Sequence, residues 1–234
     1  MSLDYNRQLE LFDPATFNKE VHVIGAGATG SWLVLILAKL GISNISVYDY
    51  DIVEEHNIPN QLYGTNSIGK SKVQELKKIV FQQTGIRIKT FDKKIQNEED
   101  TRNMKGYVFV LVDSMLFRER IFTYLLNNAQ VDMIFETRMG LEHGRIYVVN
   151  PKSSKDREKY RQTLYTDEDS AVSACGASQS VSVTAIGISQ MAVWEMLKCF
   201  KNQLHLFDED FNKYDVVNEI LFDYSSLNIL TTTW

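Results

Sequence analysis

The chain has 234 residues, of which 44% are hydrophobic and 11% aromatic, so it carries enough apolar side chains for a full core and is not a disordered chain. Lysine and arginine number 25 against 30 aspartate and glutamate, and the net charge of -5 argues against nucleic acid as a partner. The apolar, uncharged stretch at residues 23–38 is shorter than the roughly 20 residues of a membrane helix. The N-terminus is charged where a signal peptide is apolar, so we expect a cytoplasmic protein with no membrane partner.

The first predicted unit is a strand, a glycine turn, a helix and a second strand. The apolar run EVHVIG begins at Glu20, GAGATG follows at residues 25–30, and WLVLILAKL continues to a helix terminator at Gly41. The stretch ISNISVYD, residues 42–49, is rich in β-branched residues and ends in an acid. This order predicts a βαβ unit with two parallel strands.

The middle of the chain repeats this alternation. Residues 67–84 have helical spacing and are stopped by Gly85, and residues 86–91 alternate like a strand. The near-continuous apolar run at 107–113 predicts a strand buried on both faces of a parallel sheet. A helix is expected at 115–127 and strands at 132–137 and 144–150, with a turn at 143–144.

The last third has a different character. Residues 151–169 show no apolar period, so we expect a long mobile loop there, extending to about residue 178. Residues 178–200 predict a largely buried helix, and residues 216–234 predict two strands around a turn at 223–226. The predicted fold is one α/β domain over 1–234, a Rossmann-like, doubly wound, mainly parallel sheet with added C-terminal strands.

The glycine turn and the acid that follows it indicate a nucleotide site. Gly25, Gly27 and Gly30 allow close approach of a phosphate, and they leave free N–H groups at a helix N-terminus. Asp49 ends the next strand, where a carboxylate accepts hydrogen bonds from ribose hydroxyls. A dinucleotide and ATP both present ribose and phosphates, so these residues alone leave the choice open.

The segment after Asp49 favours a triphosphate. It contains a second acid, Asp51, two carboxamides, Asn57 and Gln61, and two lysines, which a hydride-transfer enzyme does not need. Lys70 and Lys72 offer positive charge to phosphates. Asp113, which ends the buried strand, stands where a carboxylate that binds a metal ion belongs.

With these motifs the chain resembles the ThiF/MoeB/HesA family, the bacterial relatives of ubiquitin-activating enzymes. Five separated pieces occur in the family's order: NRQ at residues 6–8, GAGATG, DYDIVEEHNIPNQ at 49–61, IGKSK at 68–72 and DSMLFR at 113–118. The resemblance covers residue 6 to about residue 200. It implies ATP-dependent adenylation of the C-terminal carboxylate of a ubiquitin-like or sulfur-carrier protein.

The resemblance also implies roles for single residues. The phosphate-binding turn falls on Gly25, Gly27, Ala28 and Gly30, the ribose acid on Asp49, the phosphate lysine on Lys72 and the magnesium-linked acid on Asp113. Arg7 matches an arginine that reaches the triphosphate from the second subunit of a homodimer. The rest of the nucleotide-binding stretch falls on Asp51, Asn57 and Gln61.

Three departures from the family pattern affect the expected site. The family's Arg-Gln pair is here Asn60-Gln61, and our hypothesis is that Lys70 supplies the missing charge. Ala28 replaces a glycine. Two cysteines cannot supply the four thiolates of the zinc site that many members carry, so we expect no structural zinc. Cys175 is a candidate for a thiol that takes over the activated acyl group, whereas Cys199 is expected in the core.

Several other functions stay open. Within the family, the acid can be carried by a tRNA base or a peptide. A nucleotide-binding scaffold without turnover is possible because the arginine is missing. The glycine turn alone is also compatible with an NAD-dependent oxidoreductase.

Overall fold

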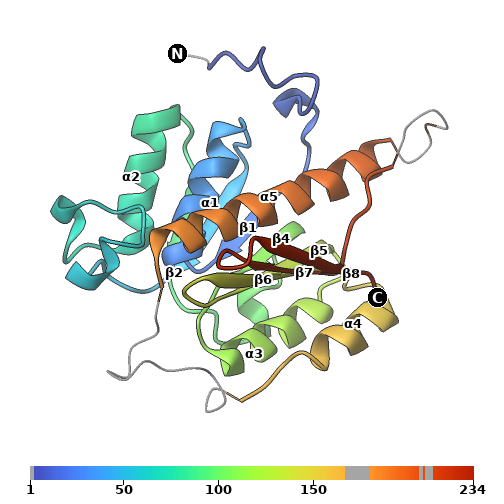
Figure 1. Ribbon diagram of the computed structural model, residues 1–234. Helices are drawn as coiled ribbons and strands as arrows, with labels where there is room; N and C mark the ends of the chain where they lie inside the picture. The colour runs from blue at the N-terminus through green and yellow to red at the C-terminus, as the bar shows by residue number, and fades with distance from the viewer. Residues whose placement is uncertain (1–2, 167–179, 206–207, 209–212) are drawn as a thin grey trace.

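The computed structural model describes residues 3–166, 180–205, 208 and 213–234. One eight-stranded sheet in the order β3-β2-β1-β4-β5-β6-β7-β8 runs through this part of the chain (Figure 1). The predicted α/β fold with a mainly parallel sheet and added C-terminal strands is therefore confirmed, and these strands extend the sheet. In chain order the main elements are β1 (Val21–Ile24), α1 (Ala28–Lys39), β2 (Ile45–Asp49), α2 (Lys72–Thr84), β3 (Lys89–Asp92), β4 (Gly106–Val110), α3 (Met115–Leu126), β5 (Val131–Met139), β6 (His143–Val149), α4 (Ser154–Arg161), α5 (Ser182–Leu204), β7 (Glu219–Asp223) and β8 (Asn228–Thr232).

The sheet has a parallel half and an antiparallel half. Strands β3, β2, β1, β4 and β5 pair in parallel, and helices or long segments connect them. Strands β5 to β8 pair antiparallel. The order of the strands reverses between β1 and β4, and in doubly wound sheets ligands bind at the carboxyl ends of the strands at such a point.

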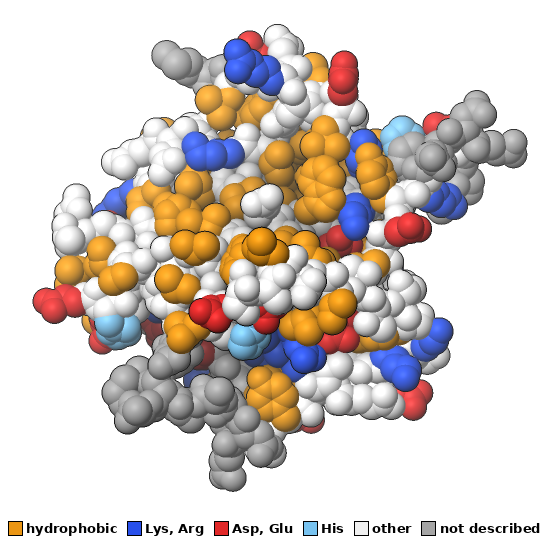
Figure 2. Space-filling model, viewed as in Figure 1, with side chains coloured by type: hydrophobic (Ala, Val, Ile, Leu, Met, Phe, Trp, Pro, Cys, Tyr) orange, Lys and Arg blue, Asp and Glu red, His pale blue; other side chains and the backbone are white. Residues whose placement is uncertain are grey.

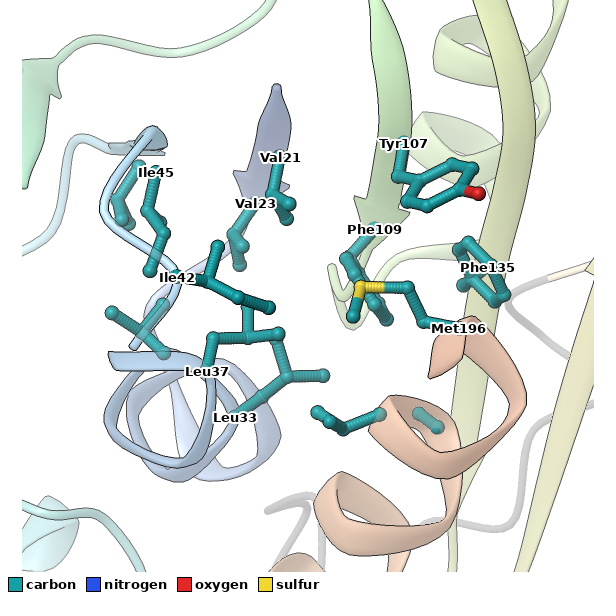
Figure 3. Close-up of a cluster of buried hydrophobic side chains, with 14 of the residues drawn as sticks. Val21, Val23, Leu33, Leu37, Ile42, Ile45, Tyr107, Phe109, Phe135 and Met196 are labelled. Atoms are coloured by element: carbon teal, nitrogen blue, oxygen red, sulfur yellow. The ribbon is translucent and has the colours of Figure 1, made fainter. Parts of the chain in front are cut away.

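Helices cover both faces of the sheet. Helices α1, α2 and α5 lie on one side and α3 and α4 on the other (Figure 1). Because side chains alternate along a strand, Val21 and Val23 join the core under α1 and α5, whereas Ile24 joins the core under α3. Figure 3 shows the first core, in which Leu33 of α1 and Met196 of α5 point toward strand side chains.

The predicted loop is described only as far as residue 166, because residues 167–178 lie outside the described residues, and its described part contains a helix. Helix α4 occupies residues 154–161, and its N-terminus is capped by Ser153, whose side chain accepts a hydrogen bond from the Asp156 N–H. Tyr160 is its one buried residue, and the centre of its ring lies 4.2 Å from the ring centre of Phe122. A single aromatic anchor gives no apolar period, so the sequence pattern missed this helix.

Other boundaries also differ from the prediction. The expected turn at 143–144 belongs to β6, and the turn lies at 140–142, where the Gly140 N–H bonds to the His143 carbonyl. Strand β4 ends at Val110, so the last three residues of the predicted strand are a loop. Helix α2 begins at Lys72 and not at residue 67, and residues 65–67 form a separate short 3-10 helix.

Helix α5 is less buried than predicted. Val183 is 64% exposed and Trp194 is 42% exposed, because the helix packs on α1 and the sheet with one face only. Figure 2 shows hydrophobic side chains gathered on this side of the molecule. No helix in the described residues is long and apolar enough to cross a membrane.

Candidate nucleotide site

The glycine turn connects β1 to α1 at the carboxyl end of the sheet. Gly25 has φ +104°, and a Cβ atom there would lie 2.6 Å from the Leu111 carbonyl oxygen. A Cβ atom on Gly30 would lie 1.9 Å from the Gly25 carbonyl oxygen, whereas one on Gly27 would meet nothing within 4 Å. Gly25 and Gly30 are thus required by the turn itself, and Gly27 leaves open space at the helix N-terminus, where Ala28 begins α1.

Asp49 is attached directly to this turn. Its carboxylate accepts hydrogen bonds from the Ala26 N–H at 2.6 Å and from the Asp51 N–H at 2.8 Å. Burial raises the pKa of Asp49, although these two bonds and the charge of Lys72 act in the opposite direction. The predicted ribose acid therefore lies beside the predicted phosphate turn.

Backbone pairing brings Lys72 to Asp51. A β-bridge joins Ile52 to Ser71, and the Lys72 N–H bonds to the Asp51 carbonyl. The Lys72 ammonium then donates to a carboxylate oxygen of Asp51 at 2.9 Å. The Lys72 side chain is almost fully buried, whereas that of Asp51 is half exposed, so solvent reaches the ion pair from the side of the Asp51 carboxylate.

The three carboxamides of the stretch differ in their partners. Asn57 accepts the Glu54 N–H at 2.9 Å, so its oxygen closes a local turn. Asn60 receives the Trp32 indole N–H at its carbonyl, and its amide N–H donates to Ser180. The bond from Trp32 holds the stretch against the first turns of α1.

Three buried polar atoms of this region lack a hydrogen-bond partner in the described part of the chain. They are Asn60 Oδ1, Gln61 Oε1 and Ser71 Oγ. A buried polar atom without a partner is costly, so such atoms indicate a group that binds there. The hydroxyl and the carboxamides suit the oxygens and hydroxyls of a nucleotide, so these residues fit ATP.

Asp113 lies in the loop after β4 and is exposed. The Ser114 N–H bonds to its carboxylate at 2.9 Å. No group of three or more metal-ligating side chains occurs among the described residues. One carboxylate is compatible with a magnesium ion that reaches the protein mainly through substrate phosphates.

Beneath this loop lies a buried charge cluster that the sequence patterns did not reveal. Glu136 is fully buried between two arginines, Arg118 of α3 and Arg138 of β5. Arg118 lies within the motif that ends at residue 118, but Glu136 and Arg138 stand in an ordinary strand pattern. Arg118 meets Glu136 because α3 packs on β5, and no local sequence pattern predicts that packing.

The two remaining predicted charges of the nucleotide site are Lys70 and Arg7. The Lys70 ammonium donates to the Asn66 carbonyl at 2.7 Å, so it has a partner other than that of Lys72, and its compensating role stays a prediction. Arg7 is exposed in the N-terminal segment, which is attached near the far end of α1 through a bond from Gln8 to the Leu40 carbonyl.

The structure describes only one of the two cysteines. Cys175 lies outside the described residues. Cys199 is buried in α5, and burial raises the pKa of its thiol to about 12, so it stays protonated and serves packing.

Known proteins with similar sequences are adenylating enzymes by name. The chain is 33% identical over 116 residues to "Probable adenylyltransferase/sulfurtransferase MoeZ" of Mycobacterium tuberculosis, a match to 49% of this chain and 29% of that protein. It is 32% identical over 116 residues to "Adenylyltransferase and sulfurtransferase MOCS3" of Dictyostelium discoideum, covering 49% and 27% of the two chains. The chain thus spans less than a third of the length of these relatives.

Solved structures show the same fold. PaaA superposes with a TM-score of 0.71 at 16% identity, and E. coli MccB, solved with ATP, superposes with a TM-score of 0.68 at 13% identity. Each match covers 92% of this chain and 64% of the other. A sequence model of the ThiF family matches residues 5–230. With the glycine turn, Asp49 and the Asp51–Lys72 pair at one edge of such a sheet, the chain belongs to the ThiF family.

Proposed function

We propose that this chain binds Mg-ATP and adenylates the C-terminal carboxylate of a small ubiquitin-like or sulfur-carrier protein. The observation that carries the proposal is the meeting of Asp49, the glycine turn and the Asp51–Lys72 pair at the carboxyl edge of the sheet. The names of the relatives, which are adenylyltransferases and sulfurtransferases, support the same chemistry.

The reaction joins two anions, so it depends on positive charge. A carboxylate oxygen bonds to the α-phosphorus of ATP, and pyrophosphate leaves with the electron pair of the broken P–O bond. The Lys72 ammonium leaves the Asp51 carboxylate and binds phosphate oxygens instead, which brings its positive charge to the triphosphate. Asp113 would hold the magnesium ion, which adds further positive charge to the triphosphate.

Most of the remaining residues bind and orient the nucleotide. Asp49 holds the ribose, and the N–H groups around Gly27 bind the phosphates at the N-terminus of α1. Gln61 binds the nucleotide through the carboxamide whose oxygen lacks a partner. In a homodimer, Arg7 reaches the triphosphate of the partner subunit, and Cys175 is the candidate acceptor of the acyl group.

The test is ATP–pyrophosphate exchange in the presence of candidate acids. A panel of sulfur-carrier proteins, peptides and tRNA identifies the acid that is activated. Lys72→Ala is expected to lower exchange at least a hundredfold, because each lost charge contact in the transition state costs a factor of about 10²–10³. The control is Lys78→Ala, an exposed lysine on the same helix, which is expected to keep wild-type exchange. Full exchange by a folded Lys72→Ala variant contradicts this assignment.

A second candidate function is a nucleotide-binding scaffold. It is favoured by Asn60, which stands where the family pattern has an arginine and so brings no positive charge. Binding of ATP without exchange on any acid of the panel would support this function. Exchange with one of the acids would exclude it.

A further inference from the structure

A buried tyrosine that no sequence pattern singled out binds the backbone of the glycine turn. The Tyr63 hydroxyl donates a hydrogen bond to the Ala26 carbonyl at 2.7 Å. The Ala26 N–H donates to the Asp49 carboxylate at 2.6 Å. Ala26 is fully buried, so side chains from two other segments of the chain hold both of its polar backbone groups.

The bond from Tyr63 fixes the orientation of the peptide unit that follows Ala26. The Ala26 carbonyl and the Gly27 N–H belong to this same unit, and no cis peptide bond occurs in the described residues. In a trans peptide unit the C=O and the N–H point in opposite directions. Because the Ala26 carbonyl points to the buried Tyr63 hydroxyl, the Gly27 N–H points away from this side chain.

The Gly27 N–H is free to bind a ligand. It donates to no group in the described part of the chain, because Gly27 stands at the N-cap of α1, where no carbonyl of an earlier turn is available. A Cβ atom on Gly27 would meet nothing within 4 Å, so ligand atoms can approach the backbone closely. Such an N–H suits a phosphate oxygen.

The packing around Tyr63 keeps its side chain in one place. Tyr63 is 3% exposed and belongs to the core under α1 and α5. The segment before it is attached to the same helix, since the Trp32 indole N–H donates to the Asn60 carbonyl and the Leu62 N–H donates to Ser31 Oγ. The position of the hydroxyl is therefore fixed relative to the N-terminal turns of α1.

The Tyr63 hydroxyl keeps its proton. Burial raises the pKa of Tyr63 well above its ordinary value, and the negative charges of Asp49 and Asp51 raise this pKa further. The hydroxyl is therefore a donor at neutral pH. A buried group that stays protonated acts by holding the backbone and not by transferring a proton.

We propose that Tyr63 is a positioning residue that keeps the Gly27 N–H directed at the phosphates of the nucleotide. Without this hydroxyl the buried Ala26 carbonyl has no partner, which favours rotation of the peptide unit. Rotation is possible because glycine accepts a wide range of backbone angles. A rotated unit presents a carbonyl oxygen to the phosphates, and its partial negative charge repels them. This inference rests on the proposed function, because it assumes that ATP binds at the glycine turn.

Calorimetric titration of the whole chain with ATP, inorganic tripolyphosphate and adenosine tests the inference. Tyr63→Phe keeps the ring and removes the hydroxyl. It is expected to weaken the binding of ATP and of tripolyphosphate about tenfold each, the size of one hydrogen bond to a charged group. Adenosine, which has no phosphate, should bind the variant and the wild type equally.

The amide signal of Gly27 gives a readout that a general loss of stability would not move. In protein labelled with nitrogen-15 glycine, this amide proton should shift downfield when tripolyphosphate binds the wild type, because it then donates to a phosphate oxygen. Gly27→Ala removes the signal and so assigns it. In Tyr63→Phe saturated with tripolyphosphate, the downfield shift should be smaller.

The matched control is Tyr107→Phe. Tyr107 is also fully buried and donates through its hydroxyl to Gln203 Oε1 at 2.9 Å, but it lies near the amino end of β4. This variant should bind all three ligands as the wild type does.

Three results would each overturn the inference. They are wild-type tripolyphosphate affinity in a folded Tyr63→Phe variant, an adenosine affinity that falls by the same factor as that for ATP, and an unchanged shift of the Gly27 amide. In those cases Lys72-dependent ATP binding by the wild type leaves the proposed function intact. A wild type that binds neither ATP nor tripolyphosphate contradicts both.

Discussion

Two glycines of one turn carry different constraints. The backbone oxygen of Gly25 occupies the position that a Cβ atom on residue 30 would take, so a side chain there would open the turn. The Cβ position of Gly27 is open space in front of the α1 N-terminus. Gly30 is therefore required by the turn itself, whereas Gly27 leaves space that the proposed phosphate ligand would occupy.

We predict that alanine at these two positions separates stability from binding. Gly30→Ala should lower the free energy of unfolding by about 2–4 kcal/mol, because the clash is with backbone. Gly27→Ala should cost about 1 kcal/mol or less, but it should weaken ATP binding because its methyl group occupies the space of a phosphate. Urea unfolding and calorimetric titration measure the two effects. Equal loss of stability in both variants would contradict the geometry of the turn.

Three structural elements meet at one buried charge cluster. Glu136 of β5 binds Arg118 of α3, and Arg138 of β5 donates to the Thr163 carbonyl at 2.6 Å, just after α4. Burial lowers the pKa of Arg118 to about 10. The carboxylate of Glu136 thus holds two cations that fasten α3 and the end of α4 to the sheet.

We expect Glu136→Gln to lower the free energy of unfolding by about 3 kcal/mol, because it leaves two buried arginines without their counter-charge. The matched control is Glu142→Gln, since Glu142 is an exposed acid in the turn between β5 and β6. Its stability should stay within about 0.5 kcal/mol of the wild type. Chemical denaturation of both variants provides the measurement. A Glu136→Gln protein as stable as the control would mean that the cluster contributes nothing to stability.

For the whole molecule, the position of Arg7 bears on assembly. The glycine turn precedes α1, and the N-terminal segment is attached near the last residues of this helix. Twelve helical residues span about 18 Å, which is longer than an arginine side chain. The Arg7 side chain is therefore too far from the glycine turn of its own chain to reach it, and we predict that it acts on the site of a second copy.

This arrangement predicts complementation between two inactive variants. Arg7→Ala and Asp113→Ala should each lose exchange activity. An equal mixture should recover about a quarter of wild-type activity, because about half of the dimers are mixed and each mixed dimer has one intact site. The assay is exchange after the subunits have been mixed and allowed to re-equilibrate. No recovery from two folded variants would show that Arg7 does not act across a dimer.

The local signals were sufficient for the first half of the fold. The apolar run of β1, the glycine turn, α1 and the acid that ends β2 all follow from periods of two or 3.6 residues and from glycine stereochemistry. Helix α4 and the exposed face of α5 did not follow. The first has one buried anchor, and the second is apolar on a face that no described element covers.

The sequence by itself determined the strand–turn–helix nucleotide motif, the mainly parallel sheet and the family, because these depend on residues close together in the chain. Only the tertiary structure decided which groups meet: Lys72 with Asp51, Glu136 with two arginines, and the Tyr63 hydroxyl with the Ala26 carbonyl. Each of these contacts joins different segments, most of them separate elements of the fold. Their distances are set by how the helices and loops pack on the sheet, and a local pattern carries no information about that packing.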